Sequence, residues 1–334
     1  MKISKKCLCL ISTVAMIVGF SFFGCSKKCT ESKQPKKPPE WTIYNTSNSG
    51  LVYNRVNAIA IDATGNKWFA TWMGVCKFDG TNWTTYTPLN SGLASYDVRT
   101  IAVDASGNKW FGTYDGVSMF DGAHWTKYDT LNSGLADNFI MIIAIDQSGN
   151  KWFGTYGGVS KFDGTNWTTY DTLNSGLVDN RVWAMAFDAS GNKWFATWCG
   201  VSKFDGTDWI TYDRSNSGLA DDGVIAIVID SSSNKWFGTY RGVSKFDGIN
   251  WTTYDTSNIG LEDNHVTVIA VDASGNKWFG SSLSGVSRFD GTNWIVYDTA
   301  NSGLGDNWVI AMAIDALGNI WFGTNDGGVS KFHE

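Results

Sequence analysis

Aromatic and charged residues that could bind a ligand are concentrated in two recurring segments of this chain. Four of its 18 tryptophans and five of its 12 tyrosines lie outside the strictly repeated positions. These residues are Trp72, Trp183, Trp198, Trp308, Tyr53, Tyr96, Tyr114, Tyr156 and Tyr240. Charged and polar variation falls in the same segments, at Arg55, Asp97, Arg99, Asp115, Arg181, Arg241, His265 and Asp326. Aromatic rings interspersed with Arg, Asp and His suit stacking on sugar rings or holding a peptide.

We therefore predict a non-enzymatic surface that recognises a glycan, a protein or a peptide. The predicted ligand-binding residues are Arg55, Trp72, Tyr114, Arg181, Trp183, Trp198, Arg241, His265 and Trp308. The alternative is packing between repeats, because Trp72, Tyr114, Tyr156, Trp198 and Tyr240 occupy one equivalent position. Trp183 and Trp308 have no aromatic counterpart in most repeats, so packing explains them less readily. A purely structural protein that docks a partner through the same residues is a further alternative.

Catalytic chemistry has one candidate pair in the repeats. Glu262 stands three residues before His265, in Gly-Leu-Glu-Asp-Asn-His. The intervening Asp and Asn have counterparts in most repeats, so half of this motif belongs to the scaffold. No nucleophile triad, Cys-His pair or metal-spaced His cluster appears elsewhere. The Asp-x-Ser-Gly-Asn segments lack the dense carboxylate spacing of a calcium loop. We predict no catalytic residue, no metal and no cofactor.

The elements that position these residues follow from a repeat. Trp-Phe recurs at Trp68, Trp110, Trp152, Trp194, Trp236, Trp278 and Trp321, in five steps of 42 residues and one of 43. A second tryptophan follows at Trp83, Trp125, Trp167, Trp209, Trp251 and Trp294. A period of about 40–45 residues with four short strands is typical of propeller blades.

Each repeat has the pattern of four strands. In one repeat we expect strands at Val182–Asp188, Lys193–Trp198, Val201–Phe204 and Trp209–Tyr212. Gly and Asn separate them, and these residues accept the positive φ of tight turns. Residues 41–334 are therefore predicted to form an all-β, seven-bladed propeller of four-stranded blades, which we expect to be monomeric.

The two chain ends share one repeat. The seventh copy of the second tryptophan is missing after Trp321 and is found instead at Trp41. Phe78 precedes Trp83 by five residues, and Phe332 precedes Trp41 by the same spacing when the chain ends are joined at Glu334 and Pro39. We predict that Trp41–Tyr44 is the outer strand of the last blade and closes the ring.

The predicted topology places the unexplained aromatic residues on one face. In a four-stranded blade, the loop between the second and third strands lies on the same face as the connection into the next blade. All nine residues fall in these two connections or at the strand ends beside them, around the mouth of the central channel. The opposite face is built from nearly identical Ser-Gly-Asn and Asp-Gly turns.

The first forty residues have a different character. Residues 1–24 combine lysines, an apolar run and Phe-Phe-Gly before Cys25, which is typical of a secretory signal. The Gly-Cys ending resembles the lipobox of bacterial lipoproteins, which implies a lipidated Cys25 and membrane attachment through the lipid alone. Ser26 fits outer-membrane sorting in such lipoproteins. Residues 25–40 are polar and basic, as expected of a flexible tether. The alternative is a plain signal peptide that is cleaved elsewhere.

Charge excludes one class of partner. Residues 1–40 hold eight Lys and two Glu, which leaves 18 basic and 30 acidic residues in the repeats, a net charge of −12. Nucleic-acid binding requires a basic footprint, and the repeats provide none. The six cysteines suggest no disulfide pair.

The segments Asp-Ala-Ser-Gly-Asn-Lys-Trp-Phe-Gly-Thr and Gly-Val-Ser-Lys-Phe-Asp-Gly resemble the two-component regulator propeller repeat. This repeat is familiar from periplasmic sensor regions of hybrid histidine kinases, and the resemblance covers all seven repeats. The resemblance implies a propeller of the cell envelope that binds a ligand or a partner. Such propellers are often linked to glycans. Those sensors also carry a second propeller, a membrane span and a kinase, so the resemblance implies no signalling output for this chain.

A second resemblance supplies the enzymatic alternative. Streptogramin lyases are seven-bladed rings with a similar Trp-Phe strand, and they use His and Glu with a magnesium ion near the channel mouth. The resemblance implies such a role for Glu262 and His265, but the second histidine of the lyases has no evident counterpart here.

Overall fold

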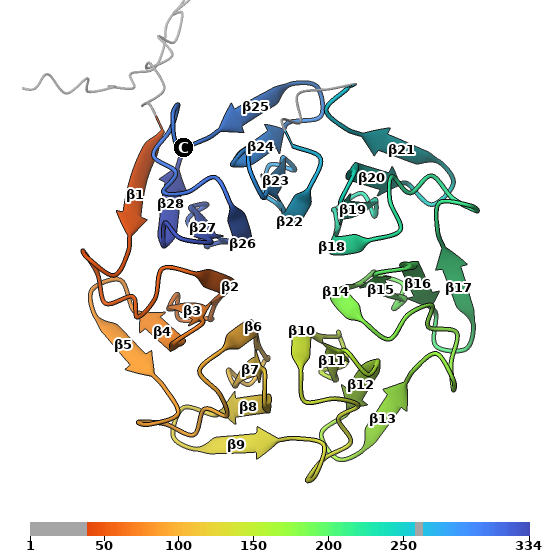
Figure 1. The fold of residues 1–334 in the computed structure, drawn as a ribbon, viewed down its shortest axis with the longest axis horizontal. Helices are drawn as coiled ribbons and strands as arrows, with labels where there is room; N and C mark the ends of the chain where they lie inside the picture. The colour runs from red at the N-terminus through yellow and green to blue at the C-terminus, as the bar shows by residue number, and fades with distance from the viewer. Residues whose placement is uncertain (1–38, 258–262) are drawn as a thin grey trace, which may run out of the picture. The chain divides into compact units, whose positions relative to one another are not determined.

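The computed structural model describes residues 39–257 and 263–334 of the 334-residue chain. These residues form 28 β-strands arranged as seven four-stranded antiparallel sheets (Figure 1). The sheets are the blades of a ring around a central channel, which confirms the predicted fold. No helix long and apolar enough to span a membrane occurs in the described residues.

The blades follow one another in chain order, each from its innermost to its outermost strand. Blade one is β2 (Val56–Ile61), β3 (Lys67–Thr71), β4 (Gly74–Phe78) and β5 (Trp83–Tyr86), and blade two is β6 (Val98–Val103), β7 (Lys109–Thr113), β8 (Gly116–Phe120) and β9 (Trp125–Tyr128). Blade three is β10 (Ile140–Ile145), β11 (Lys151–Thr155), β12 (Val159–Phe162) and β13 (Trp167–Tyr170), and blade four is β14 (Val182–Phe187), β15 (Lys193–Thr197), β16 (Gly200–Phe204) and β17 (Trp209–Tyr212). Blade five is β18 (Val224–Ile229), β19 (Lys235–Thr239), β20 (Gly242–Phe246) and β21 (Trp251–Tyr254), and blade six is β22 (Val266–Val271), β23 (Lys277–Ser281), β24 (Val286–Phe289) and β25 (Trp294–Tyr297). Blade seven is β26 (Val309–Ile314), β27 (Ile320–Thr324), β28 (Val329–His333) and β1 (Glu40–Tyr44).

The last blade closes the ring by combining both chain ends. β1 pairs antiparallel with β28, and Trp41 stands opposite Phe332 in that ladder. Phe78 stands opposite Trp83 in the same way in blade one. The register predicted from the spacing is therefore confirmed. Trp41 also packs on Phe322 and Phe332, with ring centroids 5.7 and 5.0 Å apart.

The core lies between neighbouring blades and is rich in aromatic side chains. Trp194, from the repeated Trp-Phe pair of blade four, is buried and stacks on Tyr212 of its own blade at 5.8 Å. It also contacts Phe237 and Phe246 of blade five, at 6.1 and 6.2 Å. Each blade thus covers the apolar face of the next one, as repeat architectures require.

The turn after each innermost strand is held by one aspartate. Asp188 accepts hydrogen bonds from the backbone N–H groups of Ser190 and Asn192 and from Nε1 of Trp194, at 3.1, 2.9 and 3.2 Å. Gly191 completes the turn with a φ of 82°, which glycine adopts without a Cβ clash. The repeated Asp-x-x-Gly-Asn sequence is therefore explained by the scaffold.

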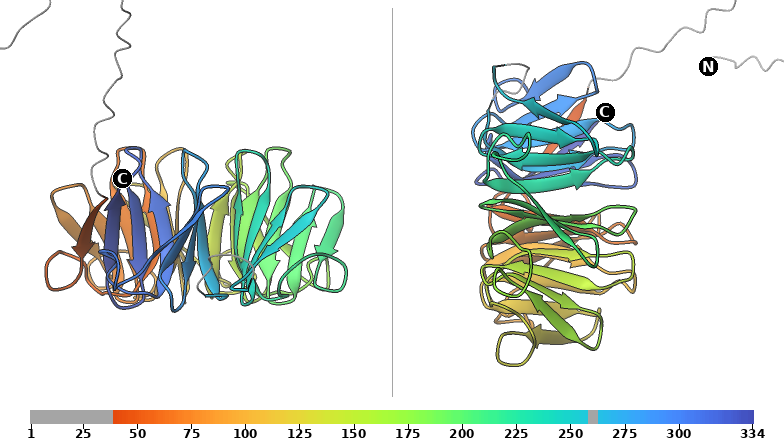
Figure 2. Two further views of the ribbon diagram at one scale, coloured as in Figure 1. Left: turned by 90° about the horizontal axis from the view of Figure 1, so that it is seen from above. Right: turned by 90° about the vertical axis from the view of Figure 1, so that its right-hand side faces the viewer.

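Connections between strands gather at the two faces of the ring (Figure 2). We call the face that carries the loops between second and third strands, and the connections into the next blade, the channel-mouth face. The opposite face carries the aspartate turns and the Asp-Gly hairpins.

Candidate functional site on the channel-mouth face

Loops from adjacent blades are tied together on the channel-mouth face. The backbone N–H of Gly116, the first residue of β8 in blade two, donates to the carbonyl of Asn138 in the connection into blade three, at 2.7 Å. Gly200 and Asp222 make the same bond between blades four and five. The two variable segments recognised in the sequence therefore form one surface, in which side chains of neighbouring blades contact one another.

Seven rings from five successive blades form a continuous chain around the mouth. We call this set the aromatic arc: Tyr114, Phe139, Tyr156, Trp183, Trp198, Tyr240 and His265. Phe139 lies between Tyr114 and Tyr156, with centroid distances of 4.8 and 4.4 Å. Trp183 lies 6.3 Å from Tyr156 and 5.9 Å from Trp198. Tyr240 continues the arc, 5.2 Å from Trp198 and 4.5 Å from His265.

Members of the aromatic arc remain open to solvent although they contact one another. The exposed fractions of Tyr114, Tyr156 and Trp198 are 55%, 44% and 41%. The repeated tryptophans of the core, such as Trp194 at 2%, are by contrast buried. Packing between blades therefore accounts for only part of the surface of each ring. An exposed group of aromatic side chains is costly for a soluble protein and is characteristic of an interaction surface.

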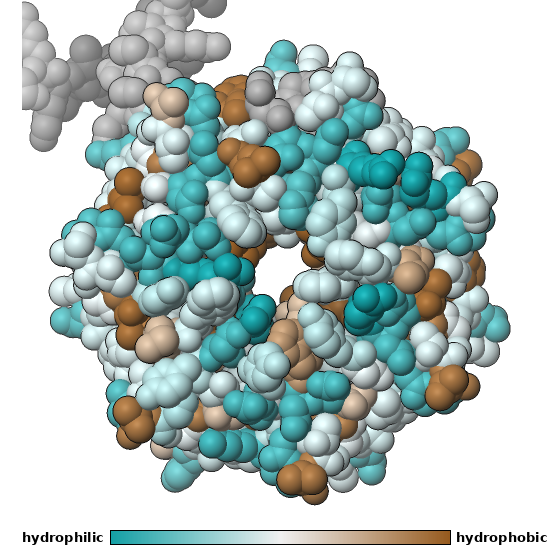
Figure 3. Space-filling model, viewed as in Figure 1, coloured by the Kyte–Doolittle hydropathy of each residue, from teal (hydrophilic) through white to brown (hydrophobic). Residues whose placement is uncertain are grey.

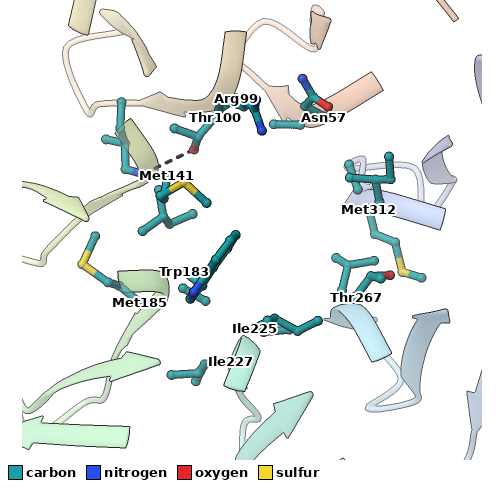
Figure 4. A pocket seen from close by; sticks show the side chains of 18 of the residues that line it. Asn57, Arg99, Thr100, Met141, Trp183, Met185, Ile225, Ile227, Thr267 and Met312 are labelled. Atoms are coloured by element: carbon teal, nitrogen blue, oxygen red, sulfur yellow. Dashed lines mark hydrogen bonds between the residues drawn. The ribbon is translucent and has the colours of Figure 1, made fainter. Parts of the chain in front are cut away.

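Trp183 connects the arc to the central channel. The channel holds a cavity of about 300 Å³ lined by the innermost strands of the blades, and it opens at the centre of the ring (Figure 3). Trp183 projects into it from β14, with Arg99, Asn57 and Thr267 among the other lining residues (Figure 4). The side chain of Trp183 is half-buried between its neighbours.

Two polar atoms near the mouth lack hydrogen-bond partners. Nε1 of Trp183 and Oδ1 of Asp97 are buried and make no hydrogen bond within the described residues. The first is a donor and the second an acceptor. Buried polar atoms are nearly always paired in folded proteins, so these two atoms are exceptions to that rule near the mouth.

A second group of side chains lies where blade seven meets blade one. We call it the Arg55 cluster: Arg55, Trp72, Trp308 and Asn325. The guanidinium carbon of Arg55 lies 4.4 Å from the ring centroid of Trp72 and 5.8 Å from that of Trp308. Nη1 of Arg55 donates to Oδ1 of Asn325 at 2.7 Å. Trp72 and Trp308 are 39% and 38% exposed, so both rings offer surface beside the cation.

Three other arginines of the mouth are paired with aspartates. Arg99 contacts Asp97 and Arg181 contacts Asp179, each at 2.7 Å. Arg241 contacts Asp221 at 3.1 Å. Arg181 also stands 5.8 Å from the ring centroid of Trp198. These pairs neutralise the arginines and hold their side chains over the aromatic arc or at its border.

His265 is placed for stacking. It lies against Tyr240 at an interplanar angle of 25°. Burial lowers the pKa of His265, against the opposing effect of Asp263, so the imidazole is neutral at physiological pH. Glu262, the other residue of the candidate catalytic pair, lies outside the described residues. No group of three or more His, Cys, Asp or Glu side chains suited to a metal occurs in residues 39–257 and 263–334.

Comparison with known proteins bears on the family and the fold. Residues 303–326 match the family model described as "Two component regulator propeller". Blade seven carries this repeat. The predicted repeat family is therefore confirmed for the matched residues, which include Trp308 and Asn325 of the Arg55 cluster. No curated protein sequence matches the chain significantly.

Several solved structures share the fold of this propeller. The extracellular domain of a hybrid two-component system of B. thetaiotaomicron aligns with a TM-score of 0.77 and 24% identity, over 89% of this chain and 41% of that one. PorZ, a surface component of the type-IX secretion system of Porphyromonas gingivalis, aligns with a TM-score of 0.72 and 18% identity, over 86% and 48%. Virginiamycin B lyase from Staphylococcus aureus aligns with a TM-score of 0.71 and 13% identity, over 89% and 99%. The chain thus spans less than half the length of the first two.

The structure divides the nine predicted site residues among these groups. The aromatic arc contains Tyr114, Trp183, Trp198 and His265, and the Arg55 cluster contains Arg55, Trp72 and Trp308. Arg181 lies over the arc, whereas Arg241 borders it through its ion pair. The sequence did not single out Phe139, although the ring fills the gap between Tyr114 and Tyr156. One sequence feature could have identified Phe139: it is an aromatic residue at the position that Trp308 occupies in blade seven.

Proposed function

We propose that this propeller is a non-enzymatic recognition module that binds a glycan or a peptide on its channel-mouth face. The aromatic arc is the observation that carries this proposal, because seven contacting rings from five blades leave part of their surface exposed on one face. Stacked aromatic side chains give a ligand a large contact area at a small cost in conformational entropy.

The polar groups around the arc suit a ligand with hydroxyl or amide groups. Neither Nε1 of Trp183, a donor, nor Oδ1 of Asp97, an acceptor, has a partner within the described residues. A small movement of these buried side chains on binding would let each form a hydrogen bond with the ligand. The channel cavity below Trp183 gives a substituent of the ligand space to enter. A binding site of this kind combines apolar surface with a few oriented polar groups.

Binding is tested by presenting a glycan array and a peptide library to the purified protein. We expect ligands from one of these classes to be retained, and Trp183→Ala to weaken their binding by ~1–3 kcal/mol, the usual range for losing a central aromatic contact. Leu131→Ala is the matched control, since Leu131 is a 94% exposed apolar residue of the same face outside the arc. Equal binding by both variants would contradict the proposed site. Retention of a folded protein partner alone would favour the structural docking alternative.

We also propose that the protein is an extracytoplasmic lipoprotein, anchored through Cys25 and directed to the outer membrane. The signal-like residues 1–24 support this proposal. So does the similarity to propellers from an extracellular domain and from a bacterial surface component. Residues 1–38 lie outside the described residues, and the proposal rests on their sequence.

The anchor is tested by metabolic labelling with palmitate. The wild-type protein should be labelled and should fractionate with membranes, and Cys25→Ser should lose both properties. The mature N-terminus provides an independent measurement. Mass spectrometry that finds any residue other than Cys25 at the mature N-terminus would overturn this assignment.

A further inference from the structure

Arg55 differs from the other arginines of the mouth in its electrostatic environment. Arg99, Arg181 and Arg241 each form an ion pair with an aspartate. Arg55 forms none with a carboxylate of the described residues, and its bonded partners are two neutral amides. Its Nε donates to Asn57 at 3.1 Å and its Nη1 to Asn325 at 2.7 Å. Nη2 therefore remains available for a further partner.

Comparison of two repeats shows why Arg55 lacks a counter-ion. Arg181 occupies the position of blade four that Arg55 occupies in blade one, immediately before the innermost strand. Asp179, two residues earlier, binds Arg181 through both carboxylate oxygens, at 3.2 and 2.7 Å. The residue two before Arg55 is Tyr53. Five repeats carry aspartate at this position: Asp137, Asp179, Asp221, Asp263 and Asp306.

Without this carboxylate, the positive charge of Arg55 lies in an environment that favours the binding of an anion. Burial, and next the positive charge of Arg99, lower the pKa of Arg55, while the smaller effects of Asp97 and Tyr53 oppose the change. Asp97 is already paired with Arg99. A partly desolvated guanidinium without a counter-ion is unfavourable, and a bound carboxylate would offset this cost through charge-assisted hydrogen bonds.

The residues around Arg55 indicate more about the ligand than its negative charge. Trp72 covers one face of the guanidinium, and the exposed parts of Trp72 and Trp308 flank it. Tyr53 packs on Trp72 at 6.3 Å, which supports the ring. A peptide is usually anchored by a side chain enclosed in a pocket, whereas Trp72 and Trp308 lie at the surface, 39% and 38% exposed. A sugar ring that carries its own carboxylate could contact an indole face and the guanidinium together.

We propose that the Arg55 cluster is a carboxylate-binding subsite and that the ligand is a glycan containing a uronic acid. In this arrangement the carboxylate accepts hydrogen bonds from the free N–H groups of Arg55, and the sugar ring packs against the exposed parts of Trp72 and Trp308. This inference rests on the proposed recognition function and narrows it to acidic glycans. The ion-paired Arg99, Arg181 and Arg241 are not expected to provide an equivalent subsite.

The experiment measures binding of oligosaccharides that contain galacturonate or glucuronate, each beside its carboxyl-reduced counterpart. The reduced sugar keeps its ring and loses only the charge. We expect an acidic oligosaccharide to bind at least tenfold more tightly than its reduced form, and the difference to shrink as ionic strength rises. Arg214→Gln removes an exposed cation of the same face outside the cluster. This control variant should keep the preference for the acidic oligosaccharide.

Substitution of Tyr53 provides the sharper test. Tyr53→Asp introduces the residue that five other repeats carry, so the variant should fold, and its carboxylate should occupy Arg55 as Asp179 occupies Arg181. Tyr53→Asn removes the same ring without adding a charge. We expect the Asp variant to bind the acidic oligosaccharide at least tenfold more weakly than the Asn variant, and the two variants to bind the reduced form equally.

The outcomes separate this inference from the proposed function. Equal affinity for acidic and reduced sugars, or equal affinity of the two Tyr53 variants for the acidic one, would overturn the carboxylate subsite. Binding of neutral glycans only, weakened by Trp183→Ala, would overturn the subsite and support the broader recognition function. Retention of peptides with a free C-terminal carboxylate, but of no sugar, would contradict the assignment to uronic acids. No retention of any glycan or peptide would overturn both proposals.

Discussion

On the face opposite the channel mouth, each blade repeats one aspartate turn, whereas on the channel-mouth face the equivalent loops differ from blade to blade. Seven turn aspartates each accept a hydrogen bond from the indole of a core tryptophan: Asp62, Asp104, Asp146, Asp188, Asp230, Asp272 and Asp315. The mouth instead leaves an indole N–H and a carboxylate oxygen unpaired, and leaves Arg55 without an ion pair among the described residues.

This contrast separates residues that maintain the ring from residues that are free to bind. A position that every blade fills identically stabilises the fold, and substitution there should destabilise the protein. A position that accepts Arg, Asp, Phe, Gly, His or Trp in different blades, as the position of Trp308 does, is not required for blade geometry.

Removal of the closing strand should have the largest effect. A chain that lacks residues 1–44 loses the β1–β28 ladder, at ~1 kcal/mol for each hydrogen bond. It also loses the packing of Trp41, worth roughly 2–3 kcal/mol. We expect a large drop in melting temperature, or aggregation through the exposed edge of β28. A chain that lacks only residues 1–38 is the control, and equal melting temperatures for the two would refute closure by β1.

Acid should destabilise the ring through the turn aspartates. Burial opposes ionisation of Asp188, but hydrogen bonds from Asn192 and Trp194 outweigh it, so the pKa of Asp188 lies below its usual range. The pKa values of the other six aspartates are lowered in the same way. A depressed folded-state pKa contributes stability above the unfolded value of about 3.9 and loses it as pH falls further. The melting temperature should thus change little between pH 7 and about 5 and fall steeply below about 4. A constant melting temperature down to pH 2.5 would contradict this role of the turns.

Trp308→Ala should separate binding from stability at the mouth. Trp308 is 38% exposed and contacts the Arg55 guanidinium, so its loss should leave the melting temperature within a few degrees of wild type. Binding of the ligand should weaken by ~1–3 kcal/mol. Calorimetry and titration on the same preparation would provide both quantities, and a large fall in melting temperature would assign Trp308 to the scaffold.

Cys76→Ser should have the smallest effect. Sγ of Cys76 accepts a hydrogen bond from the backbone of Val52 at 3.2 Å, where blade two uses the hydroxyl of Ser118 to bind Ala94 at 2.8 Å. Serine restores the residue of the six other blades, so the free energy of unfolding should change by less than ~1 kcal/mol. Urea denaturation would measure this, and a destabilisation above ~2 kcal/mol would show that the repeats are not interchangeable here.

The repeat made most of the fold predictable from the sequence. The spacing of Phe332 and Trp41 predicted the register of closure because strand pairing is nearly identical in every blade. The face of the mouth residues was predictable for the same reason, since an antiparallel blade fixes where each loop lies.

Contacts among the mouth side chains could not be predicted in this way. The bond between Arg55 and Asn325 joins residues 270 positions apart and requires both ring closure and particular side-chain orientations. The partial burial of Trp183 depends on Tyr156 and Trp198 lying on either side of it. Comparison of the repeats identifies the positions that vary. The side-chain packing at such a position cannot be inferred from another blade, because no other blade has the same set of neighbouring residues.

Two tryptophans of blade four provide the most direct test of the division between scaffold and binding surface. Trp194 is buried in the core, and Trp198 follows it by four residues and is 41% exposed in the aromatic arc. The stability and ligand affinity of Trp194→Ala and Trp198→Ala should be measured side by side. We predict a loss of ~3–5 kcal/mol in unfolding free energy for Trp194→Ala, and a small loss of stability with clearly weakened binding for Trp198→Ala. If Trp198→Ala destabilises the ring as much as Trp194→Ala does, or binds its ligand as wild type does, the aromatic arc is part of the core and the proposed binding surface is wrong.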